Sequence, residues 1–303
     1  MSSKRLFLPY LALGVGILAL AFSAMFVRWA AAPGPVTGFY RMSLAALILL
    51  PVFVRRRPSL AALPRAELLV PVFGGLLTAF DHAFWNTAVQ YTSAANATLL
   101  GNTSPIYVAL IAWLVFRERL SGMFWLGLAL SLTGAAVVLG SDFLRHPTLG
   151  WGDLLALIAG VFYAGYFLVT QHGRKRLDTL SYIWIVVLSA ALALLVISLL
   201  AGMPLTGYPP QTYLAFAGAA IVSQIVGYLS VGYALGHLPA STVSPTMIGQ
   251  PVLTALFAIP LLGEALIPAQ WLGGLVVLTG IYLVHRSRSV GDRRPVPTIL
   301  TNV

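Results

Sequence analysis

A small group of polar side chains lies inside a segment that is otherwise apolar. Asp81 and His82 are near the middle of residues 67–89, and Trp85 and Asn86 follow His82 at spacings of three and four residues. That spacing puts His82, Trp85 and Asn86 on one face of a helix. An ionisable group in hydrocarbon costs about 2.5–3.5 kcal/mol on insertion scales, so it needs a partner or a wet cavity. We therefore expect a wall that binds a zwitterion or relays a proton, because histidine titrates near neutral pH. A packed Asp81–His82 pair is the alternative.

Two further stripes of polar and aromatic residues occur at helical spacing in apolar segments later in the chain. Gln224 and Tyr228 are four residues apart, and Tyr163 and Tyr166 are three apart. Aromatic rings hold apolar groups and, through cation–π attraction, ammonium groups. We predict that these residues face the same central space as His82. An aromatic belt at the membrane interface, or ordinary packing, would also account for the tyrosines.

Polar residues also gather at one end of two other apolar segments, each of which contains a proline. Asn102 comes three residues before Pro105, and Gln250 directly precedes Pro251. Proline removes a backbone hydrogen bond from a helix, and interrupted helices form solute sites near the membrane midplane. We place Asn102 and Gln250 among the substrate-binding residues. For Pro105 and Pro251 we expect a structural role in the kink.

One basic residue, Arg41, lies seven residues into the apolar segment 35–54. Its guanidinium could neutralise a substrate carboxylate, or it could extend toward the membrane surface and hold the fold together. We favour a structural or gating role. Glu118 and Glu264 lie at predicted helix ends, where a carboxylate caps or pairs.

Motifs that would indicate an enzyme are missing from the sequence. It has no cysteine, no metal-ligand spacing, no nucleotide-binding loop and no nucleophile elbow. We therefore expect no catalytic residues, no metal and no cofactor.

The elements that must position these residues are membrane-spanning helices. The chain is 59% hydrophobic and 9% charged, whereas a soluble domain carries about 25% charged residues. About 20 apolar residues suffice to cross a hydrocarbon core as a helix. Reading between helix breakers gives ten predicted spans: 7–28, 35–54, 67–89, 93–115, 122–140, 151–171, 179–201, 211–235, 240–262 and 268–285.

The distribution of basic residues predicts the orientation. With the N-terminus inside, 15 of the 18 Lys and Arg residues fall in cytoplasmic segments, which agrees with the positive-inside rule. This distribution explains the net charge of +10 without a nucleic-acid partner. We expect a multi-pass protein of the bacterial inner membrane with both termini in the cytoplasm and a disordered tail over residues 287–303.

An internal repeat divides the chain into two halves. When residues 88–138 are compared with 234–284, a shift of 146, 15 of 51 positions are identical, against roughly one in ten by chance. Five spans per half is an odd number, so the second half must be inverted in the membrane. Inverted repeats are the building plan of many secondary transporters. We predict repeats over residues 1–146 and 147–286.

The repeated residues also resemble a known family. Ala88–Ala94, Ser104-Pro105, Arg117–Leu120 and Gly127–Gly134, with their counterparts Ala234–Ala240, Gln250-Pro251, Gly263-Glu264 and Gly273–Gly280, are similar to the EamA repeat of the drug/metabolite transporter superfamily. Phe39-Tyr40-Arg41 resembles the arginine motif of that family's second helix. The resemblance implies ten helices, a central cavity and export of metabolites. Within the family the chain is most similar to bacterial exporters of aromatic amino acids.

These observations predict a transporter of small molecules rather than an enzyme. The expected substrate is an amino acid or similar metabolite, exported by alternating access through the lipid bilayer, with protons as a candidate coupling ion. A carrier of nucleotide-sugars or lipid-linked solutes, and a passive channel-like facilitator, remain the alternatives.

Overall fold

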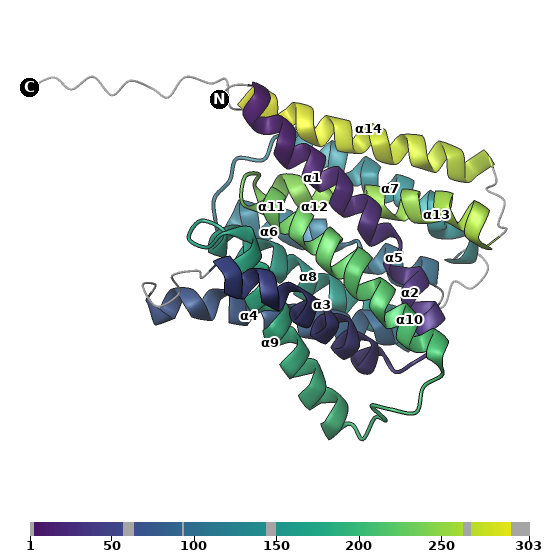
Figure 1. Ribbon diagram of the computed structural model, residues 1–303. Coiled ribbons are helices and arrows are strands. Elements are labelled where there is room, and N and C mark those ends of the chain that lie inside the picture. Colours follow the sequence, from purple (N-terminus) through teal and green to yellow (C-terminus); the bar gives the residue numbers. More distant parts are fainter. Residues whose placement is uncertain (1–2, 57–63, 93, 144–149, 263–267, 292–303) are drawn as a thin grey trace, which may run out of the picture.

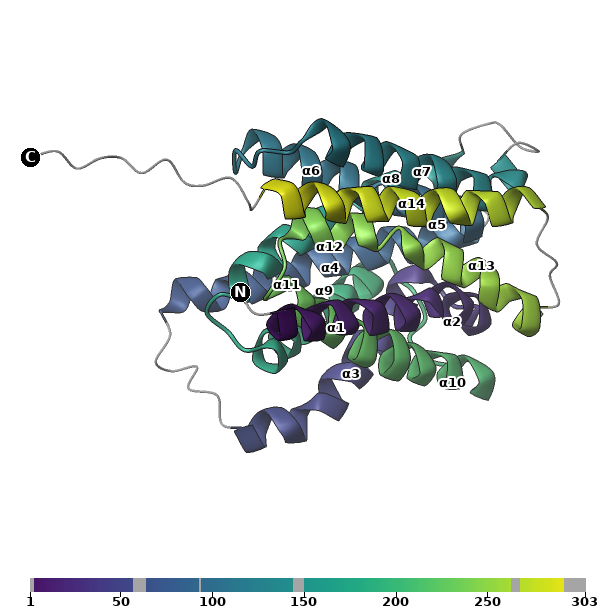
Figure 2. The ribbon, with the colours of Figure 1, turned by 90° about the horizontal axis from the view of Figure 1, so that it is seen from above.

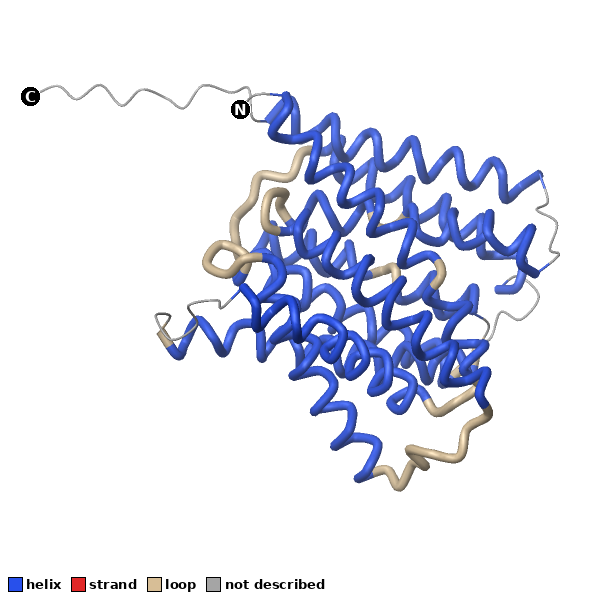
Figure 3. The backbone as a smooth tube through the Cα atoms, viewed as in Figure 1, coloured by secondary structure: helices blue, strands red, loops and turns tan. Residues whose placement is uncertain are grey.

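A computed structural model describes residues 3–56, 64–92, 94–143, 150–262 and 268–291 of the chain. Every regular element within these ranges is a helix, which confirms the all-α prediction (Figure 3). Each of the ten predicted spans corresponds to one helix or to consecutive helices.

The helices of the first half are α1 (Ser3–Ala21) with α2 (Ser23–Ala30), α3 (Gly34–Arg56), α4 (Arg65–Tyr91), α5 (Ala94–Gly101) with α6 (Ser104–Leu114), and α7 (Gly122–Phe143). Those of the second half are α8 (Trp151–Gly173), α9 (Thr179–Leu200), α10 (Pro210–Gly218) with the π-helical stretch η2 (Ala219–Tyr228) and α11 (Leu229–Leu235), α12 (Ala240–Thr246) with α13 (Gly249–Leu262), and α14 (Pro268–Gly291). Figure 1 shows their arrangement as one bundle.

Seven helical segments within the described residues are long and apolar enough to cross a membrane: Phe7–Ala30, Gly34–Arg55, Glu67–Tyr91, Ala97–Leu114, Trp151–Gly173, Thr179–Leu200 and Pro210–Leu235. Gly122–Val137 is apolar but shorter. Leucines on the outer surface, such as Leu47 and Leu192, are exposed, as expected where lipid replaces water. The chain is a polytopic membrane protein.

The fourth and ninth spans are each interrupted near their middle. α5 ends at Gly101 and α6 starts at Ser104, so that Pro105 occupies the first turn of α6, where its missing N–H costs little. In the ninth span α12 ends at Thr246 and α13 starts at Gly249, two residues before Pro251. Both prolines therefore lie directly after an interruption, at related positions in the two halves.

The fifth and tenth spans pack closely through glycine. α7 and α14 lie side by side in both views (Figures 1 and 2). A Cβ atom built on Gly127 would lie 2.7 Å from the Gly280 oxygen, and one built on Gly134 would lie 2.6 Å from the Gly273 oxygen. The 146-residue shift relates Gly127 to Gly273 and Gly134 to Gly280, so the two contacts exchange partners. A two-fold axis between antiparallel helices produces this pattern.

The first and last helices begin and end on the same side of the bundle. The start of α1 and the end of α14 are on the same side of the bundle in both views, as an even number of crossings requires (Figures 1 and 2). The helix α14 continues to Gly291, so the first residues of the segment that was predicted to be disordered, 287–291, are helical. Glu264 and residues 292–303 lie outside the described residues.

Candidate functional site

The central polar group lies on α4, which packs against α3, α8 and α9. His82 Nδ1 is 2.9 Å from the backbone oxygen of Thr78 and 3.3 Å from Asp81 Oδ2. Both neighbours of Nδ1 are acceptors, so Nδ1 carries a proton and Nε2 is the nitrogen that remains for another partner. Both side chains are buried.

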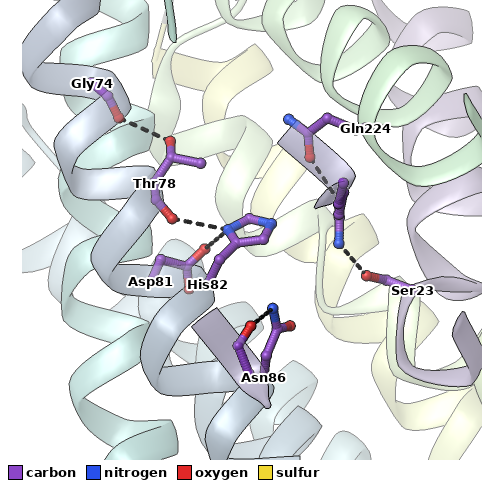
Figure 4. Close-up of polar contacts among 9 residues, drawn as sticks. Ser23, Gly74, Thr78, Asp81, His82, Asn86 and Gln224 are labelled. Carbon is purple, nitrogen blue, oxygen red and sulfur yellow. Dashed lines mark hydrogen bonds and ion pairs between the residues drawn. The ribbon is translucent and has the colours of Figure 1, made fainter. Parts of the chain in front are cut away.

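A positive charge lies on the opposite side of the same space. Arg41 of α3 is 2% exposed; its Nε donates to Gln224 Oε1 at 2.9 Å and its Nη1 donates to Ser23 Oγ at 2.7 Å. Its guanidinium carbon is 5.7 Å from the centre of the Tyr228 ring, within cation–π range. Figure 4 shows Asp81 and His82 on one side and Ser23 and Gln224 on the other.

These residues surround one cavity of about 60 Å³. Its lining comes from both halves of the chain: Leu20, Ser23, Arg41, Asp81, His82, Trp85, Thr98, Gly101, Asn102, Tyr163, Tyr228 and Gln250. An enclosed water needs about 10–15 Å³ by this kind of measure, so the cavity holds on the order of four waters. A large solute would require it to widen.

Aromatic side chains form the apolar part of the wall. The Tyr228 ring lies 5.9 Å from the His82 ring and 5.4 Å from the Tyr166 ring. The Trp85 indole is fixed by a hydrogen bond, because its N–H donates to the Ala97 backbone oxygen at 3.2 Å. Tyr163 packs on Tyr166, with ring centres 6.2 Å apart. The wall combines rings with charges of both signs.

Two amides at the helix interruptions complete the lining. Asn102 follows α5 and donates to the Thr98 oxygen at 2.8 Å, whereas Gln250 lies in the first turn of α13 and donates to the Leu20 oxygen at 3.1 Å. Each NH₂ group has two protons, so one bond to backbone leaves a donor and the amide oxygen for a solute.

Seven of the ten predicted substrate-binding residues line this cavity, and Asn86, Tyr166 and Gln224 do not. The Asn86 amide donates to the Gly34 oxygen at 3.1 Å and so ties α4 to α3. Tyr166 is buried and packs against the Tyr228 ring, and Gln224 accepts from the Arg41 guanidinium. These three side chains lie outside the lining of this cavity, and their role in binding a solute stays a prediction.

The eighth span contains a feature that the sequence did not reveal. Residues Ala219–Tyr228 form a π-helical stretch that carries both Gln224 and Tyr228. π-helical turns are rare and occur frequently at functional sites. The cavity lining also includes Ser23, Thr98 and Gly101, which were not among the predicted substrate-binding residues. Thr98 belongs to the polar end of the fourth span, and Ser23 is a polar residue inside an apolar span.

Arg174 and Asp178 make the polar contacts of the connection between α8 and α9. Arg174 Nε donates to the Gly232 oxygen of α11 at 3.0 Å. Asp178 caps α9 by accepting from the backbone N–H groups of Leu180 and Ser181. Partial burial raises the pKa of the Asp178 carboxyl, but hydrogen bonds from Ser181 and Leu180 and the nearby Arg174 charge outweigh it, and the net pKa is lowered.

The described part of the chain contains no group of three or more His, Cys, Asp or Glu side chains that could hold a metal ion. Side chains of opposite charge, amides and aromatic rings line the cavity described above.

Known proteins with similar sequences are transporters. An uncharacterised transporter of Archaeoglobus fulgidus is 29% identical over 257 residues, which cover 81% of this chain and 85% of that protein. A protein of Streptantibioticus cattleyicolor named as a probable terminal-alkyne amino-acid exporter is 25% identical over 80% of each chain. A solved crystal structure with 18% identity covers 93% of this chain and 98% of its own, with a TM-score of 0.77, and has the same fold.

The model of the EamA-like transporter family, part of the drug/metabolite transporter superfamily, matches the chain twice, over residues 8–140 and 150–286. These two matches cover most of the chain and fall on the two halves that the 146-residue shift relates. The chain belongs to the EamA-like transporter family.

Proposed function

We propose that this transporter exports amino acids, including large neutral and aromatic ones, across the bacterial inner membrane by alternating access. The observation that carries the proposal is one cavity between the two halves, in which a carboxylate, a guanidinium, two amides and three aromatic rings face the same space. A zwitterion with an apolar side chain needs those groups. The relative named as a probable exporter of an amino acid supports the substrate class.

In this proposal Asp81 receives the ammonium group of the solute. Asp81 is paired with His82 alone among the described basic side chains, so it can accept a further donor. Trp85, Tyr163 and Tyr228 accommodate the side chain of the solute, which rings do with little discrimination between apolar shapes. Asn102 and Gln250 hydrogen-bond its polar groups. Backbone recognition is then strict and side-chain recognition broad.

Movement of the solute follows from the two related halves. Symmetry-related halves exchange conformations, so a site between them opens first to one side and then to the other. His82 lines the cavity, and histidine is the residue type that ordinarily changes charge near neutral pH, so protons are the proposed coupling ion. The distribution of basic residues supports an orientation with both termini in the cytoplasm.

Counterflow in proteoliposomes tests the proposal. Vesicles loaded with unlabelled L-phenylalanine should accumulate labelled L-phenylalanine, and leucine and tryptophan should compete, whereas phenylethylamine should not. Arg28→Gln, which changes an exposed arginine outside the cavity, is the matched control and should keep wild-type counterflow.

Other outcomes separate the alternatives. A channel-like facilitator would equilibrate label without counterflow. Accumulation of a nucleotide-sugar or a lipid-linked sugar in place of amino acids would contradict the substrate class and leave the transporter fold intact. Dissipating a proton gradient should slow net transport if protons are coupled to it.

A further inference from the structure

Arg41 is a buried charge with no carboxylate beside it. It is 2% exposed, it lies inside a membrane span, and none of the described Asp or Glu side chains is within ion-pair distance of it. The partners it has, Ser23 and Gln224, are neutral. A guanidinium in the membrane interior requires compensation for its lost hydration, and two neutral hydrogen bonds supply only part of that compensation.

The Arg41 guanidinium lines the cavity and has donors that make no hydrogen bond with the described residues. Arg41 is one of the lining residues. Its two hydrogen bonds use Nε and one proton of Nη1, and Nη2 makes none with the described residues. A guanidinium is a planar fork of five donors that matches the two oxygens of a carboxylate. Three of those five donors remain for a ligand.

Ser23, Gln224 and Tyr228 fix the direction of that fork. Ser23 and Gln224 accept from two different nitrogens, and the Tyr228 ring lies 5.7 Å from the guanidinium carbon. A side chain held at three points cannot turn away from the cavity without losing these contacts. Preorganisation of this kind lowers the entropy lost when a ligand binds.

The cavity is therefore polarised. Arg41 contributes a positive charge from α3, and Asp81 contributes a negative charge from α4, paired with His82 on its own helix. The two side chains share one cavity without forming an ion pair with each other. A zwitterion that lies between them meets an opposite charge at each end.

We infer that Arg41 binds the carboxylate of the transported solute through its free guanidinium donors and sets the solute's orientation, with the ammonium group toward Asp81. This inference rests on the proposed transport function. It replaces the structural or gating role expected for Arg41 with a role in specificity. Ser23 and Gln224 are positioning residues that act through Arg41, and Asn102 and Gln250 contact other polar atoms.

Three ligands of similar shape test the carboxylate and the ammonium group of the solute separately. L-phenylalanine carries both groups, L-phenylalaninamide keeps the ammonium and lacks the carboxylate, and 3-phenylpropionate keeps the carboxylate and lacks the ammonium. Their binding to purified full-length protein is measured by calorimetry. Wild type should bind phenylalanine best. Charge-assisted hydrogen bonds to a carboxylate correspond to about 10- to 150-fold in affinity, so the amide should bind weaker by that factor.

The variants should lose different probes. Arg41→Gln should weaken phenylalanine and 3-phenylpropionate by about 10- to 150-fold and leave the amide within about threefold. Asp81→Asn should instead weaken phenylalanine and the amide and leave 3-phenylpropionate within about threefold. Arg41→Lys, which keeps the charge without the fork, should fall between wild type and Arg41→Gln. Arg28→Gln should bind all three probes as wild type does.

Two outcomes would overturn the inference, and a third would contradict the proposed function instead. Equal loss of all three probes in Arg41→Gln, with folded protein by size-exclusion chromatography, indicates a structural role only. If Arg41→Gln does not fold, wild type and Arg41→Lys decide: equal affinity of wild type for phenylalanine and its amide contradicts the inference. Binding of 3-phenylpropionate that depends on Arg41, without any amino-acid transport, would support the carboxylate site and contradict the proposed function.

Discussion

The third and eighth spans are related by the internal repeat, and they form facing parts of the cavity in different ways. α4 is a continuous α-helix that presents Asp81 and His82. The eighth span passes through the π-helical stretch η2, with Tyr228 in the position related to His82 and Gln224 in the position related to Thr78. Only the α4 side carries an acid, because the position related to Asp81 is Gly227.

This difference separates two requirements of a transporter. The halves must be alike in fold to exchange conformations, and the glycine contacts of α7 and α14 keep that likeness. In the proposed mechanism the two ends of the site must differ in order to orient a polar solute, and the opposite charges of Asp81 and Arg41 would provide that difference. Symmetry is retained in backbone packing and is lost in the side chains that face the cavity.

The largest expected effect comes from removing the acid of the α4 side. Asp81→Asn should reduce L-phenylalanine counterflow by about 10- to 150-fold, because the ammonium loses a charged partner. Glu67→Gln is the control, since it removes the same charge from the first turn of the same helix, beside Arg176. Wild-type counterflow by Asp81→Asn would show that the charge asymmetry is not used.

The shared part of the two halves can be tested through glycine. Gly134→Ala and Gly280→Ala each place a methyl group within 2.6 Å of the neighbouring helix, so each should lower stability by about 1–3 kcal/mol. Thermal unfolding in detergent measures both. Gly14→Ala is the control, because a Cβ there meets nothing within 4 Å. A large loss of stability in one of these two variants and none in the other would contradict the two-fold packing.

On the η2 side, Tyr228 should matter through its ring rather than its hydroxyl. Tyr228→Leu removes a cation–π partner of Arg41, an interaction of about 0.5–2 kcal/mol, so the half-saturating phenylalanine concentration should rise by about 2- to 30-fold. Tyr228→Phe should stay close to wild type. A larger loss in Tyr228→Phe than in Tyr228→Leu would indicate that the hydroxyl is the functional group.

The smallest effect concerns a helix cap that only the second half has. Asp178 caps α9, and the related position before α3 is Ala32. Asp178→Ala should lower stability by about 0.5–1 kcal/mol, a value reduced for partial exposure. Because the folded pKa of Asp178 is lowered, its stabilisation is present above the unfolded pKa of about 4 and is lost as pH falls. Thermal unfolding of both proteins should therefore converge at acidic pH; a constant difference would contradict the role of the charge.

Much of the fold could be predicted because its signals are local or repeated. Runs of apolar residues between breakers such as Pro33-Gly34-Pro35 mark spans, and they need no knowledge of neighbouring helices. The repeat related Gly127 to Gly273 before any contact was known. The Asp81–His82 pair could be placed in the site because an acid in mid-span has few other uses.

The rest depends on how helices rotate about their axes, which no single segment encodes. Gln224 has the spacing of a cavity residue, but it accepts a hydrogen bond from Arg41 and does not line the cavity. Asn86 lies on the His82 stripe, and its amide instead reaches the Gly34 backbone of α3. The amino-acid composition of the π-helical stretch does not distinguish it from an ordinary α-helix. Partners more than 180 residues apart, such as Arg41 and Gln224, appear only in three dimensions.

The most direct measurement of the central claim uses the absence of cysteine from the chain. Thr98→Cys puts a single thiol in the cavity lining, and Leu47→Cys puts one on the lipid-facing surface as the control. A membrane-impermeant thiol reagent is applied to vesicles of each orientation, with and without L-phenylalanine. The account predicts labelling of Thr98→Cys from both sides, protection by phenylalanine and no labelling of Leu47→Cys. Labelling from one side only, or labelling of Thr98→Cys that no amino acid changes, would contradict alternating access to one solute site.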